Sequence, residues 1–124
     1  MPASSHKKRI KNYQKGHYAE SIATAYLMLK GYQILAKRHR APVGEVDVIA
    51  KRSSLLCFCE VKLRANLNAG AWAVTPHQQQ RIIRAAEHWL QRFPQYHEND
   101  IRFDVICLAP WKWPRHIKNA FIQN

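Results

Sequence analysis

The stretch that decides the fold is residues 44–62, GEVDVIAKRSSLLCFCEVK, which has the pattern of two apolar strands joined by a short polar turn. Apolar residues, many of them β-branched, fill most of 46–50 and 55–61, as is typical of buried strands. The polar break Arg52-Ser53-Ser54 between them predicts a β-hairpin. The hairpin also carries acidic residues inside its apolar strands, where a purely structural hairpin would not need them.

The length of the turn decides which side chains face each other across this hairpin. With a loop of two residues at 53–54, or of four around them, residues whose numbers sum to 107 pair, and Asp47 faces Glu60. Glu45 faces Lys62 in the same register, and all four side chains share one face because side chains alternate along a strand. A three-residue loop would break this arrangement, and the sequence leaves both registers open.

Two carboxylates placed opposite each other are destabilising unless something offsets their repulsion. The candidates are a shared proton, a divalent cation, or a neighbouring cation such as Lys62. Asp47 and Glu60, helped by the Val61 carbonyl, would make a suitable open site for Mg²⁺ (or Mn²⁺), which binds one or two carboxylates plus waters and phosphates. Lys62 could orient an attacking water or stabilise charge developing on a phosphate. The alternative is a Glu-Lys ion-pair cluster on an exposed hairpin face.

An acidic residue in one strand, followed by Glu-x-Lys in the next, resembles the D…(D/E)-x-K signature of the restriction-endonuclease-like nuclease superfamily, which includes archaeal Holliday-junction resolvases. The chain is similar in more detail to the YraN family, an uncharacterised bacterial group, over about residues 16–121. Four blocks in order carry this resemblance: 44–50 (GEVDVIA), 58–62 (FCEVK), 73–76 (AVTP) and 102–105 (RFDV).

The resemblance implies an α/β fold with a restriction-endonuclease-like αβββαβ core, in which helices flank a central mixed sheet. It also implies that Asp47, Glu60 and Lys62 are the metal-binding and catalytic positions. Glu20, in the first helix, matches a further active-site acid of the resolvase-like branch. A lysine usual at the start of the second helix is Gln78 here, which weakens a phosphate contact at this position.

The first helix is predicted at about 16–30, and its periodicity leaves the place of Glu20 open. One apolar stripe consists of Tyr18, Ile22, Tyr26 and Leu29. Glu20 lies nearly opposite that stripe, which by periodicity alone places it on the surface. Ala23 and Leu27 follow Glu20 at helical spacing and could form a second buried edge.

Three residues predict where the second helix begins. Thr75 suits the N-cap, Pro76 suits the first helical position, and Gln78 completes a capping box with Thr75. This gives Gln78 a structural role outside the site. Gln79 falls at the start of the buried stripe of this helix, where a polar side chain needs a partner. It is a candidate for contacting the active-site groups or a substrate phosphate, and the alternative is a hydrogen bond to a strand end.

A last buried strand is expected at 101–108, with a mixed aromatic and basic tail after it. Asp104 in this strand is expected to be an ion-pair partner of Arg102 or Arg81. The tail at 111–121 has the composition of a single-strand stacking surface, although packing of its aromatic residues onto the sheet is the other outcome.

The chain has 20 Lys and Arg against 8 Asp and Glu, a formal net charge of +12. This balance indicates a polyanionic partner, with nucleic acid as the leading one. A ribosome-associated protein or an anionic-membrane binder would share it, so charge supports binding and not cleavage. The resemblance implies DNA in preference to RNA. The residues expected to contact nucleic acid flank the hairpin and are Lys37, Arg38, Arg40 and Arg64.

With 124 residues the chain is expected to form one nuclease-like domain at 16–124, preceded by a flexible basic arm at 1–15. The arm either contacts nucleic acid or is a solvated tail. No apolar run approaches the roughly 20 residues that span a bilayer, and no apolar signal segment is present, so a cytoplasmic protein without a membrane partner is expected. Three cysteines in apolar runs are expected to be small core residues.

These observations lead to one hypothesis and one alternative. The hypothesis is a Mg-dependent endonuclease-like protein that hydrolyses phosphodiester bonds in DNA, with branched DNA as one candidate substrate and repair or recombination as its setting. Asp47 and Glu60 hold the metal, Lys62 assists the water, and Glu20 and Gln79 contribute in second rank. The alternative is a non-catalytic nucleic-acid-binding module with the same fold. Resolvase-like relatives commonly act as dimers, so a homodimer is one possibility, although no interface signature is present.

Overall fold

The computed structural model describes residues 2–68, 70 and 72–122, with side chains from Gly16 onward. Within these residues the chain forms two α-helices, one short 3₁₀ helix and five strands. In chain order these are α1 (Pro2–Leu29), β1 (Gln33–Ala41), β2 (Gly44–Arg52), β3 (Leu55–Leu63), α2 (Pro76–Arg92), η1 (Pro94–Tyr96), β4 (Asp100–Leu108) and β5 (Arg115–Phe121).

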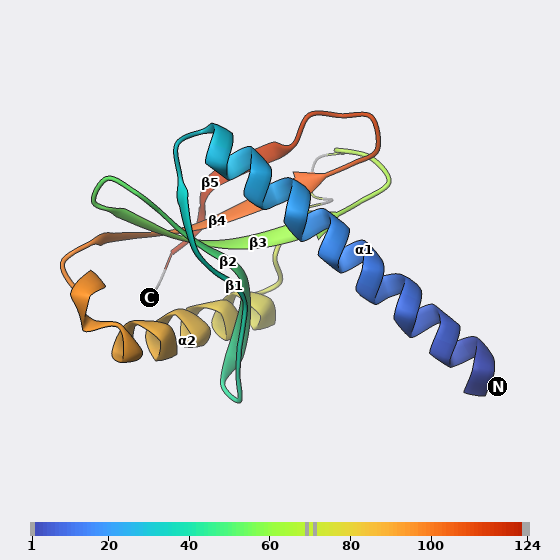
Figure 1. Cartoon of the computed structure of the whole chain (residues 1–124), viewed down its shortest axis with the longest axis horizontal. Helices are drawn as coiled ribbons and strands as arrows, with labels where there is room; N and C mark the ends of the chain where they lie inside the picture. The colour runs from blue at the N-terminus through green and yellow to red at the C-terminus, as the bar shows by residue number, and fades with distance from the viewer. Residues whose placement is uncertain (1, 69, 71, 123–124) are drawn as a thin grey trace.

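The five strands form one mixed sheet in the order β1-β2-β3-β4-β5. β1, β2 and β3 pair antiparallel, and α2 then crosses over so that β4 pairs parallel to β3. β5 adds an antiparallel strand beside β4. The helices α1 and α2 lie on opposite sides of the sheet (Figure 1). This confirms the predicted α/β architecture with its αβββαβ core, while β5 was not predicted.

The hairpin between β2 and β3 has the predicted register. Arg52 pairs with Leu55 across a two-residue loop, and Val48 pairs with Cys59, so the numbers of paired residues sum to 107. Ser53 in the loop has a φ of +53°, a conformation that tight hairpin loops demand. The short turn and the apolar strands on both sides therefore fix the register together.

Each side of the sheet has its own core, because the central strands are apolar on both faces. On the side of α1, the core contains Ala19, Ala23, Leu27, Val48, Cys57, Cys59 and Ile106. On the side of α2, it contains Ile49, Phe58, Ile82, Ala86, Trp89 and Phe103. The three cysteines are buried free thiols, as predicted.

The buried face of α1 is the second edge that the sequence offered, and not the aromatic stripe. Ala19, Ala23 and Leu27 are buried, whereas Tyr18 and Leu29 are exposed. Small alanine side chains let the helix backbone approach the sheet closely, which explains why this face is preferred over the bulkier one.

α1 begins at Pro2, earlier than the predicted start at Gly16. No Gly or Pro interrupts residues 3–15, so the sequence permits a continuous helix. This part of α1 projects beyond the sheet (Figure 1). The segment expected as a flexible arm is therefore helical here, while the division into an arm and a domain stays a prediction. Among the described residues, no helix combines the length and the apolar character that crossing a membrane requires.

α2 starts as predicted and is anchored to β2. The Thr75 side chain accepts a hydrogen bond from the Gln78 N–H at 3.2 Å, and the Gln78 side chain accepts one from the Thr75 N–H at 3.1 Å. Gly44 at the start of β2 lies directly against α2, where a Cβ atom would overlap the Arg81 carbonyl oxygen. Only glycine lets β2 begin this close to the helix.

Candidate active site

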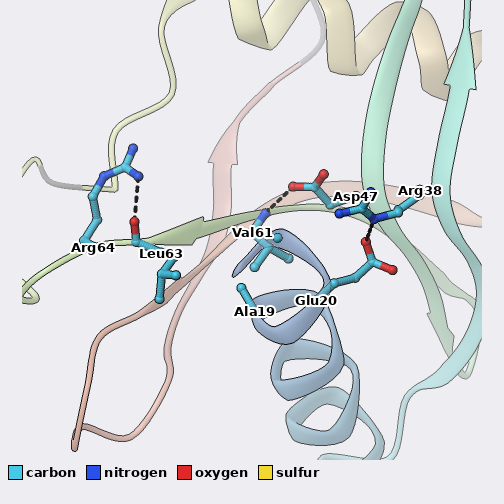
Figure 2. A pocket seen from close by; sticks show the side chains of 8 residues that line it. Ala19, Glu20, Arg38, Asp47, Val61, Leu63 and Arg64 are labelled. Carbon is cyan, nitrogen blue, oxygen red and sulfur yellow. Dashed lines mark hydrogen bonds and ion pairs between the residues drawn. The ribbon is translucent and has the colours of Figure 1, made fainter. Parts of the chain in front are cut away.

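The site lies at a fork where β2 separates from β3. The ladder between these strands runs from Arg52–Leu55 to Val48–Cys59, while β2 continues beside β1 as far as Gly44. β3 stays paired with β4 to its end. At the fork, an Asp47 carboxylate oxygen accepts a hydrogen bond from the Val61 N–H at 2.8 Å (Figure 2). The Asp47 carboxylate thus replaces a backbone carbonyl as the acceptor for the Val61 N–H, which places an acid at the opening of the fork.

The Asp47 and Glu60 carboxyl groups lie close enough at this fork for Asp47 to shift the pKa of Glu60. Burial of Glu60 and then this contact with Asp47 raise the pKa of Glu60 to about 9, against the weaker opposing effects of Lys62 and Arg40. Two carboxyl groups can share a hydrogen bond only when one is protonated, so Glu60 carries the proton at neutral pH. The raised pKa of Glu60 favours a proton on this pair, one of the three ways in which the sequence offered to offset the repulsion.

The oxygen atoms at the fork fit the donor set of a hard divalent cation. Mg²⁺ or Mn²⁺ accepts two carboxylates and a main-chain carbonyl, with waters completing the shell, so Asp47, Glu60 and Val61 provide suitable ligands. No group of three His, Cys, Asp or Glu side chains in the described part of the chain could hold a metal ion. A cation at the fork would therefore depend on water or phosphate for its other ligands, and it would displace the Glu60 proton.

Lys62 is held beside this pair by the N-terminus of α2. Its side chain is buried, with 8% of the residue exposed, and Nζ donates a hydrogen bond to Gln78 Oε1 at 3.3 Å. The same Gln78 oxygen completes the capping box. The structural role predicted for Gln78 is confirmed by the capping box, and the same side chain also contacts the predicted catalytic lysine.

Glu20 faces the same opening from α1. It is 8% exposed, so the surface position suggested by periodicity is wrong. Its Oε2 accepts a hydrogen bond from Arg38 Nε at 2.7 Å. Arg38 has a φ of +52° within β1, and such strain in a residue other than glycine occurs mostly at functional sites. Figure 2 shows Glu20, Arg38 and Asp47 around one pocket.

This acid pocket has a volume of about 320 Å³ and is lined by Gly16, Ala19, Glu20, Arg38, Asp47, Val61, Leu63 and Arg64. Arg40 reaches its edge, with a guanidinium nitrogen 3.6 Å from Asp47 Oδ1. The predicted cationic residues Arg38, Arg40 and Arg64 therefore gather around the fork. Lys37 is exposed on β1 and is not among the described residues that line the pocket.

Gln79 lies apart from the acid pair. Its Nε2 donates a hydrogen bond to the Val74 carbonyl at 2.9 Å, and it lines a different pocket with Trp72 and Phe121. The predicted alternative, a hydrogen bond to a strand end, is wrong in its partner, because the Val74 carbonyl lies in the loop before α2. Gln79 makes no described contact with Asp47 or Glu60, and its role at the site stays a prediction.

Glu45 does not face Lys62 as the register predicted. Arg81 of α2 donates hydrogen bonds to both Glu45 carboxylate oxygens, at 2.6 to 3.2 Å, and this pairing lowers the pKa of Glu45. The reason is the fork itself, because β2 leaves β3 at Val48 and follows β1 toward α2. The predicted face of four charged side chains is therefore not formed: Asp47 lines the pocket beside Glu20, and Lys62 contacts Gln78 of α2.

A second buried acid, Asp104, has a structural environment. It is 0% exposed. Its carboxylate accepts hydrogen bonds from Arg102 at 2.8 Å, from His116 Nε2 at 2.7 Å and from the Asn119 N–H at 3.0 Å. Burial opposes ionisation, but the donors of His116, Arg102 and Asn119 outweigh it and lower the pKa of Asp104 to about 2. The predicted pair with Arg102 is confirmed, while His116 was missed because β5 was not foreseen.

The fold and the fork define the class: an α/β protein with a restriction-endonuclease-like core. A model of the uncharacterised protein family UPF0102 matches residues 19–108. The chain is 51% identical over 120 residues to a UPF0102 protein of Bradyrhizobium diazoefficiens, covering 97% of this chain and 90% of the relative. It is 48% identical over 120 residues to one from Rhodopseudomonas palustris strain BisB18, with 97% and 89% covered. A Nitrobacter winogradskyi relative is 49% identical over 113 residues, with 91% and 96% covered.

The chain therefore belongs to the UPF0102 family, which is the YraN family of the sequence resemblance.

Proposed function

We propose that this protein is a divalent-cation-dependent endonuclease that hydrolyses phosphodiester bonds in DNA. The observation that carries the proposal is the contact between the Asp47 and Glu60 carboxyl groups at an open fork, with Lys62 held beside them. A pair that raises the pKa of Glu60 to about 9 lowers the stability of the fold at neutral pH. Such an arrangement is expected where acids serve chemistry instead of folding.

Each residue at the fork has a role in this proposal. Asp47, Glu60 and the Val61 carbonyl would hold Mg²⁺ or Mn²⁺. The bound ion would supply Lewis-acid activation of the phosphate and of a water. Lys62, fixed by Gln78, has further N–H donors with which to orient the attacking water or a phosphate oxygen. Glu20 positions Arg38 through their ion pair.

Substrate binding follows from the cations around the fork. Arg38, Arg40 and Arg64 supply donors for phosphate oxygens on both sides of the acid pair. The formal charge of +12 adds long-range attraction for a polyanion. The preference for DNA over RNA, a branched substrate, a setting in repair or recombination, and a homodimer rest on the sequence resemblance alone.

A cleavage assay on the full chain tests the proposal. Labelled single strands, duplexes, flaps and four-way junctions are incubated with Mg²⁺ or Mn²⁺, with RNA strands in parallel. Cleavage is expected to require the cation, and Asp47→Asn and Lys62→Ala are each expected to lower its rate at least about 100-fold. The control Glu45→Gln changes an acid of the same strand that pairs with Arg81, and we expect its rate within about threefold of wild type. Cation-dependent cleavage that survives Asp47→Asn and Lys62→Ala would refute the mechanism.

The strongly basic charge also favours a second candidate, a non-catalytic nucleic-acid-binding module with the same fold. This candidate predicts binding that weakens steeply with salt, survives chelation of divalent cations and survives Asp47→Asn, with no cleavage of any substrate in the panel.

A further inference from the structure

An apolar groove adjoins the acid pocket. Its volume is about 470 Å³, and its lining includes Tyr18, Ile22, Leu63, Pro110, Trp111 and Lys112. Leu63 lines both the groove and the acid pocket. The two hollows therefore adjoin at the end of β3, where Leu63 contributes to both.

Trp111 at the rim of this groove is both fully exposed and strained. The Lys112 N–H donates a hydrogen bond to the Ala109 carbonyl at 3.3 Å, closing a four-residue turn with Pro110 second and Trp111 third. Trp111 has a φ of +62°, which is the type II arrangement whose third position favours glycine. Its relative exposure is 101%, so burial does not compensate for the strain.

These properties give Trp111 no role in folding. A large aromatic side chain normally stabilises a protein by leaving water, and this one remains in it. Strain and exposure together point to a ligand that covers the ring. Tyr18, which is 67% exposed on α1, presents a second aromatic ring to the same groove.

We propose that this groove binds unpaired nucleobases of the strand whose phosphate enters the acid pocket. Flat aromatic rings stack on any base, and the apolar floor suits base faces released from a duplex. The substrate class is then DNA with a single-stranded segment beside the cleaved bond, such as a flap, a gap or a free end. This inference rests on the proposed function for the neighbouring acid pair.

Charge favours a nucleic-acid occupant over an apolar peptide. Among the described residues, those that line the groove include Lys112 and no acid. Arg64 follows Leu63 directly and lines the acid pocket, so it lies where a backbone phosphate would pass from groove to pocket. Cations on the rim with aromatic rings in the groove are the combination by which proteins hold single strands.

Binding measured in EDTA tests this proposal without any need for cleavage. Fluorescence anisotropy of a labelled oligothymidylate of about 12 nucleotides gives the affinity of the full chain. Trp111→Ala is expected to weaken that affinity about 5- to 100-fold, the loss of one stacked base, while Trp111→Phe retains most of it. The matched control is Trp113→Ala, an exposed tryptophan outside the groove lining that contacts Tyr26 with 6.5 Å between ring centroids. Its affinity is expected to stay within about twofold of wild type.

Two further measurements complete this test. A blunt duplex is expected to bind Trp111→Ala and wild type equally, because its bases are already stacked. Glycine suits the positive φ at the third position of this turn. The melting temperature of Trp111→Gly is therefore expected to be no lower than that of wild type, while its affinity for single strands is still lost.

Three results would overturn the proposal. These are an unchanged single-strand affinity in Trp111→Ala, equal losses on single strand and duplex, and a loss in Trp113→Ala as large as that in Trp111→Ala. Asp47→Asn separates the two proposals, because it removes the acid pair and leaves the groove. Single-strand affinity that Asp47→Asn retains and Trp111→Ala loses supports the groove whether or not the protein cleaves DNA.

Discussion

Two acids on neighbouring strands have pKa values shifted in opposite directions. Asp104 on β4 pairs with Cys59 of β3, and Glu60 is the next residue along β3. The pKa of Asp104 is lowered to about 2 and that of Glu60 is raised to about 9. Burial raises the pKa of both carboxyl groups, so burial is not what gives the two shifts their opposite signs.

The difference lies in the groups that surround each carboxyl. Asp104 accepts hydrogen bonds from a guanidinium, an imidazole and a backbone N–H, which stabilise its charge more than burial opposes it. Glu60 meets another acid, Asp47. In the same sheet, Asp104 therefore joins β4 to β5, whereas the environment of Glu60 lowers the stability of the fold at neutral pH. The second acid is the one expected to have a function outside folding.

The largest expected effect comes from breaking the Asp104 cluster. Asp104→Ala leaves the Arg102 guanidinium without its buried partner, and removal of one member of such a pair costs about 3 to 5 kcal/mol. Urea unfolding followed by circular dichroism measures this loss. Glu98→Ala, at an exposed acid, serves as control and is expected to stay within about 0.5 kcal/mol of wild type. A loss below about 1 kcal/mol for Asp104→Ala would contradict the structural role.

Glu60→Gln is expected to have the opposite sign. The folded-state pKa of Glu60, about 9, lies above its ordinary value of 4.5. The stability contributed by its proton is therefore complete below about pH 4.5 and is lost as the pH rises toward 9. A glutamine cannot ionise, so the variant should gain several kcal/mol at about pH 8 and little at about pH 4.

Thermal unfolding at the two pH values measures this gain. Glu45→Gln is the matched control, because it removes an ion pair with Arg81 and should not stabilise the protein at either pH. A Glu60→Gln variant less stable than wild type at both pH values would show that Glu60 serves the fold.

The stability of the protein at acidic pH tests the effect of Asp104. Its pKa of about 2 lies below the ordinary value of 3.8. The stability that it contributes is complete above about pH 4 and is lost as the pH falls to about 2, a change of about 2 kcal/mol. Urea midpoints between these pH values should fall more steeply for wild type than for Asp104→Asn. Parallel slopes would mean that the Asp104 carboxylate is not stabilised by its donors.

A divalent cation should relieve the strain at the fork and leave the Asp104 cluster unaffected. Mn²⁺ at ten times its dissociation constant stabilises a folded protein by about 1.4 kcal/mol. Calorimetry is expected to show this rise for wild type and Asp104→Asn, its reversal by EDTA, and its absence in Glu60→Gln. Equal stabilisation of Glu60→Gln would place the cation elsewhere.

The parts of the fold that sequence predicted correctly depend on local patterns. The two-residue turn at Ser53-Ser54 set the register of the hairpin, and Thr75 with Gln78 set the start of α2. Such features depend on neighbours in the chain, so a single sequence contains them. The last strand, β5, was missed because only its final residue, Phe121, is fully buried, and an edge strand has little apolar periodicity.

The site was predicted less completely, because its geometry depends on contacts between distant elements. The register of the hairpin is as predicted up to Val48–Cys59, but beyond it β2 leaves β3, and Gly44 and Glu45 lie against Arg81 of α2. Glu20 is buried because α1 uses its small residues against the sheet, a choice that periodicity left open. Neither α2 packing nor the choice of helix face can be read from the hairpin alone.

Titration of Mn²⁺ into isotope-labelled protein tests most directly whether the fork is a cation-activated site. Paramagnetic broadening of backbone amide signals needs no substrate, and the Asp47→Asn, Glu60→Gln double variant is the control. We expect selective broadening around Asp47, Glu60 and Val61 that disappears in the double variant and is unchanged in Asp104→Asn. Broadening that is absent, scattered over the surface, or retained in the double variant would contradict a cation site at the fork.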